Sequence, residues 1–257
     1  PAHDPNDFEV GVRHNLPMPV VIDERGKINE NGGPYAGLDR KEARNKIVAD
    51  LEEQGFLVKI DNHEIAMIYS DRSGEIVEPL LKDQWFVKQT ELAKSAIEAA
   101  QAGKVRFVPD RYQKVFLDWL ENIRDWNISR KLWWGHRIPV YYTEDGTAVA
   151  AHSWEEAEQK SGKKVVAQDE EVLDTWFSSG LWPFATLGWP DSDADVKAYY
   201  PTSILVTDRN ILYLWVARMV MMGLDFVNEI PFHDVYIHAT VLTEDGRRMS
   251  KSLGTGV

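Results

Sequence analysis

Three stretches in the first half of the chain carry apolar residues at the spacing of an α-helix. The first begins after Asp39, a residue type that caps helices, and ends at Gly55; the second covers residues 90–102 and stops at Gly103. The third is the most regular, so we expect a stripe buried in the core rather than a platform for stacked bases. The expected buried positions are Ala43, Ile47, Val48 and Leu51 in the first, Leu92, Ala96, Ile97 and Ala100 in the second, and Tyr112, Val115, Phe116, Trp119, Leu120 and Ile123 in the third.

The last third of the chain alternates between apolar runs of two kinds. Residues 204–207 are a short run rich in β-branched side chains, residues 211–222 are apolar at helical spacing up to Gly223, and residues 235–242 are a second strand candidate. This order predicts a β-α-β unit and a parallel sheet. Ligands of such sheets bind beyond the carboxyl ends of the strands, so residues 207–210 and those after Ile237 are candidates for a site.

The remaining segments are less regular. Residues 16–22 are an extended run broken by proline, and residues 31–34 are expected to form a loop. Residues 143–168 turn polar, with a Glu-rich helical patch at 154–160, and we expect a surface insertion between two buried segments.

Composition fits a soluble globular chain of 257 residues, with 44% hydrophobic and 27% charged residues. No apolar run is long enough for a transmembrane helix or a signal peptide, so we expect a cytoplasmic protein with no membrane partner. The absence of cysteine excludes disulfides, thiol nucleophiles and Cys-based metal sites. The chain begins at Pro1 without methionine and stops at Val257, which leads us to expect a piece of a longer protein.

Charge is spread unevenly along the chain. The formal net charge is −12, which argues mildly against a general nucleic-acid binder. Residues 104–137 nevertheless hold 8 basic and 4 acidic side chains, whereas residues 138–200 hold 4 basic and 12 acidic ones. The chain therefore holds a basic segment although its net charge is negative.

The segment after the last strand candidate is rich in hydrogen-bond donors. Residues 244–254 read Glu-Asp-Gly-Arg-Arg-Met-Ser-Lys-Ser-Leu-Gly and show no apolar periodicity. Lysine, serine hydroxyls and exposed backbone N–H groups suit phosphate oxygens, although the composition alone is equally that of a solvated basic loop.

The order of residues in this loop resembles a known signature. Residues 248–252, Arg-Met-Ser-Lys-Ser, are similar to the KMSKS motif of class I aminoacyl-tRNA synthetases. Further matching segments occur in the same order at 127–139, 172–184 and 214–219, and residues 1–11 resemble the closing part of the family's editing insertion. The segments Trp-Trp-Gly-His-Arg-Ile-Pro and Asp-Thr-Trp-Phe-Ser-Ser resemble the corresponding segments of valyl-type enzymes more closely than those of the isoleucyl or leucyl types.

The resemblance implies a fold and a division of the chain. The fold would be α/β, with the second half of a Rossmann-type parallel-sheet catalytic domain preceded by the C-terminal part of a mixed β-rich editing domain. Residues 1–78 would belong to the editing domain. Residues 79–257 would form the catalytic part, with an insertion at about 143–168 and the KMSKS-like loop at the end.

The resemblance also implies a reaction. Valine would be activated by ATP with Mg²⁺ as substrate, giving valyl-adenylate and pyrophosphate, and then attached to the tRNA for valine. We expect a monomer that contacts tRNA through the basic segment 104–137. Lys251 would stabilise charge on the departing pyrophosphate, with Arg248 in the place of the first lysine and Ser250 and Ser252 donating to phosphate. The expected ATP-binding residues are Thr207, Asn210, His238, Ala239, Thr240, Met249 and Lys251.

Two tryptophans and two aspartates complete the implied sites. Trp176 and Trp215 would line a tight apolar pocket for valine, with the neighbouring Asp174 ordering a turn. An apolar pocket rejects threonine poorly, so a second, hydrolytic site is needed; valyl-type enzymes are themselves the standard example of this limit. Asp7, with Asp4, would grip the ammonium group of mischarged threonine there, although two aspartates beside Pro5 are otherwise typical of a turn.

Some positions depart from the family pattern. Asn210 stands where members commonly have aspartate, and Ala239 where they have glycine. Relatives often carry Cys-based zinc in the insertion, and this sequence, without cysteine, predicts none. The family's His-Ile-Gly-His type signature is absent from these residues, so we expect the chain alone to be inactive.

Three other interpretations remain open from the sequence. One is an isoleucyl-type synthetase, which has similar motifs. A second is a non-catalytic tRNA-binding paralogue, which the Asn210 departure favours. A third is a nucleotidyltransferase that does not use tRNA, which the editing-like start disfavours.

Overall fold

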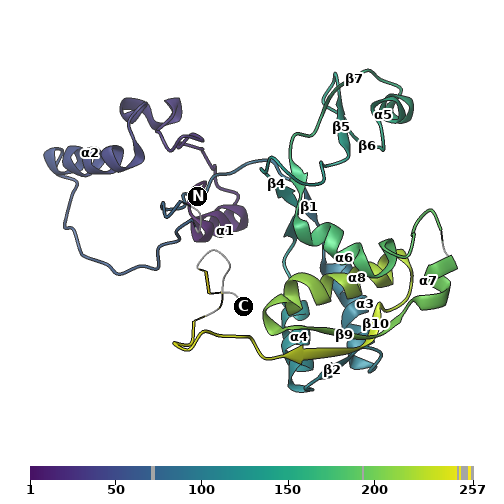
Figure 1. The fold of residues 1–257 in the computed structure, drawn as a ribbon. Helices are drawn as coiled ribbons and strands as arrows, with labels where there is room; N and C mark the ends of the chain where they lie inside the picture. The colour runs from purple at the N-terminus through teal and green to yellow at the C-terminus, as the bar shows by residue number, and fades with distance from the viewer. Residues whose placement is uncertain (71–72, 193, 248, 250–253, 256–257) are drawn as a thin grey trace. The chain divides into compact units, whose positions relative to one another are not determined.

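The computed structural model describes residues 1–70, 73–192, 194–247, 249 and 254–255 (Figure 1). The chain divides into two compact units, residues 1–83 and residues 84–257. Among the described residues, no helix is long and apolar enough to cross a membrane.

The first unit is built from helices and turns. Its elements are α1 (Pro5–His14), a 3₁₀ helix η1 (Glu30–Tyr35) and α2 (Arg40–Glu53). The predicted helix after Asp39 is confirmed, and the Asp39 carboxylate accepts a hydrogen bond from the backbone N–H of Lys41. Its predicted buried stripe is confirmed only in part: Ala43 is buried and Val48 is partly buried, whereas Ile47 and Leu51 are both more than a third exposed. The expected loop at residues 31–34 is part of the 3₁₀ helix.

The expected β-rich character is not seen in the described part of this unit. It holds only isolated bridges, such as Ile22 with Ile28 and Tyr69 with Ile76, and the extended run 16–22 forms no ladder. Apolar residues do alternate over Phe56, Val58 and Ile60, as in a strand, but all three are exposed. A strand needs a neighbour to accept its hydrogen bonds, and these residues have none within the described unit.

The second unit contains the predicted parallel sheet. Three strands, β2 (Arg106–Val108), β10 (Phe232–His238) and β9 (Thr202–Asp208), lie in the order β2-β10-β9, and both pairings are parallel. Three helices, α3 (Thr90–Gln101), α4 (Arg111–Glu121) and α8 (Ala217–Phe226), share one core with the sheet. The predicted stripe of α4 is confirmed, since Phe116 and Leu120 are fully buried and its other apolar residues pack against the same core.

The boundaries of the β-α-β unit differ from the prediction. β10 ends at His238 rather than at residue 242, because no strand of the described chain pairs beyond the register His238↔Asp208. The predicted helix over 211–222 is three pieces: a 3₁₀ turn η2 (Arg209–Ile211), a π-helical turn η3 (Leu212–Val216) and α8, which continues past Gly223 to Phe226. A π turn shifts the side chains that follow it, and such turns often occur at functional sites.

One face of the parallel sheet is open. Phe107, Leu205 and Val235 face the helices and are buried, whereas the next row, Val108, Val206 and Tyr236, is exposed. Parallel sheets are ordinarily covered on both faces. In the described chain the helices of the shared core cover one face only.

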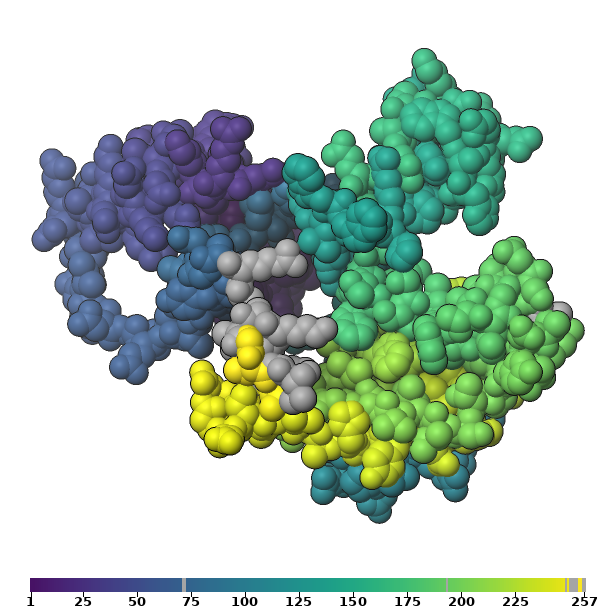
Figure 2. Space-filling view, viewed as in Figure 1, coloured from purple at the N-terminus to yellow at the C-terminus, as the bar shows by residue number. Residues whose placement is uncertain are grey.

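Residues 140–168, in the middle of the second unit's sequence, form antiparallel strands and one helix. β5 (Val140–Thr143) pairs with β6 (Ala148–Ala150) and β7 (Val165–Gln168), and α5 (Trp154–Ser161) packs on them around a small core of its own. Figure 2 shows this segment as a teal-green lobe. Two short antiparallel pairs lie beside this segment in the chain: β1 (Phe86–Val87) with β3 (Trp126–Asn127), and β4 (Ser129–Arg130) with β8 (Val172–Leu173). After β8 come the helices α6 (Thr175–Ala185) and α7 (Ala194–Tyr199).

Candidate active site

Polar side chains gather beyond the carboxyl ends of β9 and β10. Asp208, the last residue of β9, accepts hydrogen bonds from the Asn210 backbone N–H at 2.7 Å and from the Thr240 hydroxyl at 2.6 Å. The Asn210 amide also donates to Asp208 and, at 3.2 Å, to the Thr240 hydroxyl. The structure therefore brings together two of the predicted ATP-binding residues, Asn210 and Thr240, around one carboxylate.

Asp208 lies within the segment 207–210 that the strand order marks as a candidate, but the sequence analysis gave it no role of its own. Partial burial raises the pKa of this carboxyl, but hydrogen bonds from Thr240 and Asn210 and the nearby His238 outweigh it, so the pKa lies below its ordinary value. The carboxylate is thus charged at neutral pH. The signal that could have found it is its position as the first acidic residue after the buried run of the strand.

The other predicted nucleotide-binding residues of this edge differ in exposure. His238 and Ala239 are exposed, and the His238 Nδ1 lies 2.9 Å from the Ala239 carbonyl oxygen. Thr207 is buried in the core face of β9, so its side chain does not reach the surface of this edge. Only its backbone is placed to approach a ligand.

The predicted phosphate-binding loop lies largely outside the described residues. Arg248, Ser250, Lys251 and Ser252 belong to the part that the structure does not describe, and Met249 is half-buried. A tight turn leads into the loop, in which the Thr243 backbone N–H donates to the Arg247 carbonyl oxygen at 2.8 Å. Gly246 has a φ of +79° in this turn, a conformation that favours glycine.

The two predicted pocket tryptophans are carried by neighbouring helices. Trp215 lies on the π turn η3, and its indole N–H donates to the Ser179 carbonyl oxygen on α6 at 2.9 Å. Ser179 is one helical turn beyond Trp176 on α6. Trp182, further along α6, packs against Trp215 with ring centroids 6.1 Å apart. α6 thus carries Trp176, a second indole and the acceptor that fixes Trp215.

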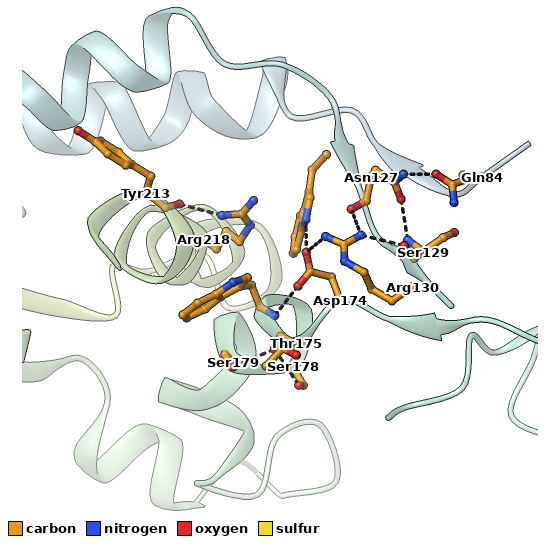
Figure 3. A network of polar contacts seen from close by, with 12 residues as sticks. Gln84, Asn127, Ser129, Arg130, Asp174, Thr175, Ser178, Ser179, Tyr213 and Arg218 are labelled. Atoms are coloured by element: carbon orange, nitrogen blue, oxygen red, sulfur yellow. Dashed lines mark hydrogen bonds and ion pairs between the residues drawn. The ribbon is translucent and has the colours of Figure 1, made fainter. Parts of the chain in front are cut away.

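A buried carboxylate fixes the start of α6 (Figure 3). Asp174 accepts from the Trp176 backbone N–H at 3.0 Å, which caps the helix, and from the Trp126 indole N–H at 3.0 Å. The Arg130 guanidinium forms an ion pair with the same carboxylate. This geometry agrees with the predicted role of Asp174 in ordering the turn. Asp174 also binds the Trp126 indole and the Arg130 guanidinium, which the sequence did not predict.

Arg218 extends the same cluster from α8. Its guanidinium stacks on the Trp126 ring at 4.1 Å, and one of its N–H groups donates to the Tyr213 carbonyl oxygen at 2.8 Å. Burial lowers the pKa of Arg218 to about 10, although the Asp174 charge opposes the shift. The helices bearing Trp176 and Trp215 are therefore tied by charge, stacking and hydrogen bonds.

The predicted editing residues lie in the first unit. Asp4 caps α1 and accepts from the backbone N–H groups of Asn6 and Asp7 at 2.8 and 2.9 Å. Asp7 stands in the first turn of α1 with its side chain exposed. His3 holds this end in place, because its ring nitrogens contact the Pro79 carbonyl oxygen and the Val21 N–H, each at 2.9 Å. Asp4 is thus a structural cap, and Asp7 faces solvent.

Neither aspartate lines the larger of two cavities described in the first unit. That cavity, of about 390 Å³, is bordered by residues 22–26, Arg40 and residues 75–80 apart from Val77. Arg40 and Glu78 form an ion pair at its edge, with the two side-chain atoms 2.8 Å apart. Within the described chain, no group of three or more His, Asp or Glu side chains is placed to hold a metal ion.

The family model of class I tRNA synthetases (I, L, M and V) matches residues 41–257. The chain therefore belongs to the class I tRNA synthetase family. Within that family its relatives are valine–tRNA ligases. The Thermotoga maritima and Carboxydothermus hydrogenoformans proteins of that name are each 56% identical to it over the whole chain. The chain spans about 30% of their length.

Solved structures agree on the fold. Two structures of Mycobacterium tuberculosis methionyl-tRNA synthetase with bound methionyl-adenylate superpose with TM-scores of 0.50 and 0.51. Each covers 74% of this chain, and the chain covers 32% of theirs, at 15% and 16% sequence identity. The likeness confirms the α/β fold.

Proposed function

We propose that this protein takes part in the activation of valine by ATP and its transfer to the tRNA for valine. The observation that carries the proposal is the similarity of the whole chain to part of the valine–tRNA ligases, together with the Trp215 indole held on η3 by α6, the helix that carries Trp176. In the reaction, an oxygen of the valine carboxylate attacks the α-phosphate of MgATP. The bond between the α- and β-phosphates breaks, and pyrophosphate leaves with the electron pair.

The residues of this chain would hold the two substrates. Lys251 and Arg248 would balance the charge that grows on pyrophosphate, and Ser250, Ser252 and Met249 would contact the phosphates or the base. At the carboxyl edge of the sheet, Asp208 could accept hydrogen bonds from the ribose hydroxyls, since it supplies the carboxylate that Asn210 lacks. Thr240 and the backbone of residues 207 and 238–239 complete that edge. Positioning supplies most of the rate.

The amino-acid side chain would meet Trp176 and Trp215. The Ser179 carbonyl oxygen holds the Trp215 indole, and Asp174 caps the helix that carries Trp176, which leaves the pocket little freedom to adapt. A small branched side chain then fits, and a longer one is excluded by size, with about 1–3 kcal/mol for each extra methylene. This rigidity supports valine over isoleucine.

The proposal extends to the whole chain. Residues 1–78 would be the end of an editing domain and residues 79–257 part of the catalytic domain. The basic segment 104–137 would face tRNA, and the protein would act as a cytoplasmic monomer. Neither a structural zinc nor a membrane partner is part of the proposal.

Transfer to tRNA tests this proposal directly. The test uses a chimera in which residues 1–257 replace the matching segment of the Thermotoga maritima protein, so that this relative supplies the rest of the enzyme. It should charge the tRNA for valine with valine. A chimera that folds and binds ATP but charges this tRNA with no amino acid would refute the proposal.

Replacing Asp7 by alanine should impair editing in the chimera. Apolar pockets of valyl-type enzymes discriminate against threonine by only about 10², so without hydrolysis threonyl-tRNA should accumulate toward about one part in a hundred. The measurement is the amount of threonyl-tRNA after incubation with threonine. Glu9→Ala, which removes an exposed carboxylate two residues further along α1, is the matched control and should leave that amount at the parental level. Equal accumulation in both variants, or in neither, contradicts the assignment.

Asp174→Ala should weaken the amino-acid pocket. It leaves the indole N–H of Trp126 and the charge of Arg130 without their acceptor and uncaps α6, at about 2 kcal/mol of stability. Because α6 carries Trp176, the KM for valine should rise about tenfold while the KM for ATP changes little.

Asp169→Ala is the matched control for Asp174→Ala. Asp169 also accepts from an indole N–H, that of Trp85 at 2.9 Å, and from the Tyr142 hydroxyl at 2.7 Å. Both variants should lower the melting temperature. An equal rise of the valine KM in both would mean that Asp174 acts on stability alone.

A further inference from the structure

Two adjacent tryptophans project from the loop between β4 and β5. Trp133 and Trp134 are 106% and 93% exposed, and among the described residues neither ring packs against another aromatic ring. Large aromatic side chains are ordinarily buried, and exposed ones mark binding surfaces. The valine pocket uses neither of them, so their exposure needs a separate explanation.

The loop that carries the two indoles is anchored at both ends. On one side, β4 pairs with β8 through Ser129 and Arg130. On the other, the Leu173 N–H donates to the His136 carbonyl oxygen at 2.7 Å, and the Arg137 guanidinium donates to the Asp169 and Gln168 carbonyl oxygens at 2.7 and 3.0 Å. The loop is thus a supported projection, and a ligand that stacks on it would not have to order the backbone first.

Gly135 gives this projection its shape. Its φ is +155°, and a Cβ at this position would lie 2.9 Å from a Val172 methyl group. Only glycine lets the chain pass so close to β8 directly after the two indoles. The turn places Trp133 and Trp134 outward together, whereas consecutive residues of a strand point to opposite faces.

Charge around the indoles is positive. Residues 129–137 contain Arg130, Lys131 and Arg137 and no acidic residue. Asp174 neutralises Arg130, and Arg137 donates to two backbone carbonyls while its charge also acts on the nearby Asp169 carboxylate. Lys131, next to the indoles, is exposed. Exposed rings with adjacent cations are the combination that binds single-stranded nucleic acid, where bases stack and phosphates pair with the cations.

The loop is also close to the proposed site of adenylate formation. Arg130 contacts Asp174, which caps the helix of Trp176. Trp133 is three residues from Arg130, so their Cα atoms are at most about 11 Å apart. A nucleic acid stacked on the indoles therefore ends near the amino-acid pocket.

We propose that Trp133 and Trp134, with Lys131, form a stacking platform for the single-stranded 3′ end of tRNA. The proposal rests on the proposed function for the identity of the RNA. The two exposed indoles would each stack on a base of the unpaired CCA end, and the Lys131 ammonium would pair with a phosphate. Their role is to hold the terminus beside the pocket before the amino acid is transferred.

RNA binding by the 257-residue chain tests the platform. The probe is a short, fluorescently labelled single-stranded RNA ending in CCA, followed by anisotropy, with a blunt duplex of the same sequence for comparison. The chain should prefer the single strand. Removing both rings in a Trp133→Ala, Trp134→Ala variant should raise the Kd by about tenfold or more for each ring. A Trp133→Phe, Trp134→Phe variant, which keeps a ring at each place, should recover part of the loss.

Two further variants sharpen the measurement. Lys131→Ala should reduce the slope of log Kd against log salt by about 0.7, the value for one phosphate contact on a single strand. Trp154→Ala removes a partly exposed indole from the insertion and serves as the matched control, with a Kd within twofold of the parent. Melting temperatures check that each variant is folded.

Several outcomes would overturn the platform. They are no binding of the single strand, equal binding of the duplex, an unchanged Kd in the double alanine variant, and an equal loss in Trp154→Ala. A Kd that stays constant while the double variant changes the sedimentation coefficient would instead make the indoles a protein-docking surface. Failure of the proposed function is seen separately, because valine activation by the chimera requires no RNA.

Discussion

The 257-residue chain alone is expected to show no valine-dependent ATP–pyrophosphate exchange. The resemblance implies two signatures for the ATP site, and only the KMSKS-like one, residues 248–252, occurs in this sequence. The measurement is incorporation of labelled pyrophosphate into ATP with and without valine.

The chimera provides the comparison for that result. With the missing signature restored, exchange should appear and depend on valine, whereas the isolated chain should stay at background at any practical concentration. Activation of valine by the isolated chain would show that residues 84–257 hold a complete ATP site.

Lys251→Ala in the chimera should lower the rate of valine activation by about 100- to 1000-fold. A cation placed where charge develops contributes mainly in the transition state, and removal of one such donor typically has an effect of this size. The KM for valine should change little, because the pocket indoles Trp176 and Trp215 lie on other elements. Exchange rates at saturating valine and ATP give the comparison.

Arg247→Ala is the matched control for Lys251→Ala. Arg247 lies in the turn that leads into the same loop, is exposed and is already paired with Asp245. Its removal takes one positive charge from the same segment without touching the proposed phosphate contact, so the exchange rate should fall less than threefold. An equal loss in both variants would mean that general positive charge, rather than Lys251, supports the reaction.

The elements with internal hydrogen bonds and a buried face could be predicted from the sequence. The periodicity of α4 located Phe116 and Leu120 in the core, and the order of apolar runs predicted the parallel pairing of β9 with β10. Boundaries were less predictable, since the π turn carrying Trp215 shows no signal in apolar spacing. The stripe of α2 was right only in part, because amphipathic spacing says which face is apolar and not how completely that face is covered: Ile47 borders the same hollow as the buried Ala43 but is 37% exposed.

The candidate site could be predicted in part. Motif residues such as Trp215 and Asp174 were identified, and the structure supplied their partners, Ser179 and Trp126. Asp208 was inside the candidate segment 207–210 but was given no role, because one acidic residue at a strand end is common and its contact with Thr240, 32 residues away, is what distinguishes it. The roles of Lys251 and Asp7 stay predictions.

Amino-acid-dependent exchange by the chimera tests the central claim most directly. Exchange should be measured side by side with valine, isoleucine and no amino acid at equal concentrations. Valine should be preferred over isoleucine by about 10- to 200-fold, the range that one methylene provides in an apolar pocket. Equal activation of the two, or a preference for isoleucine, would contradict a valine pocket built on Trp176 and Trp215.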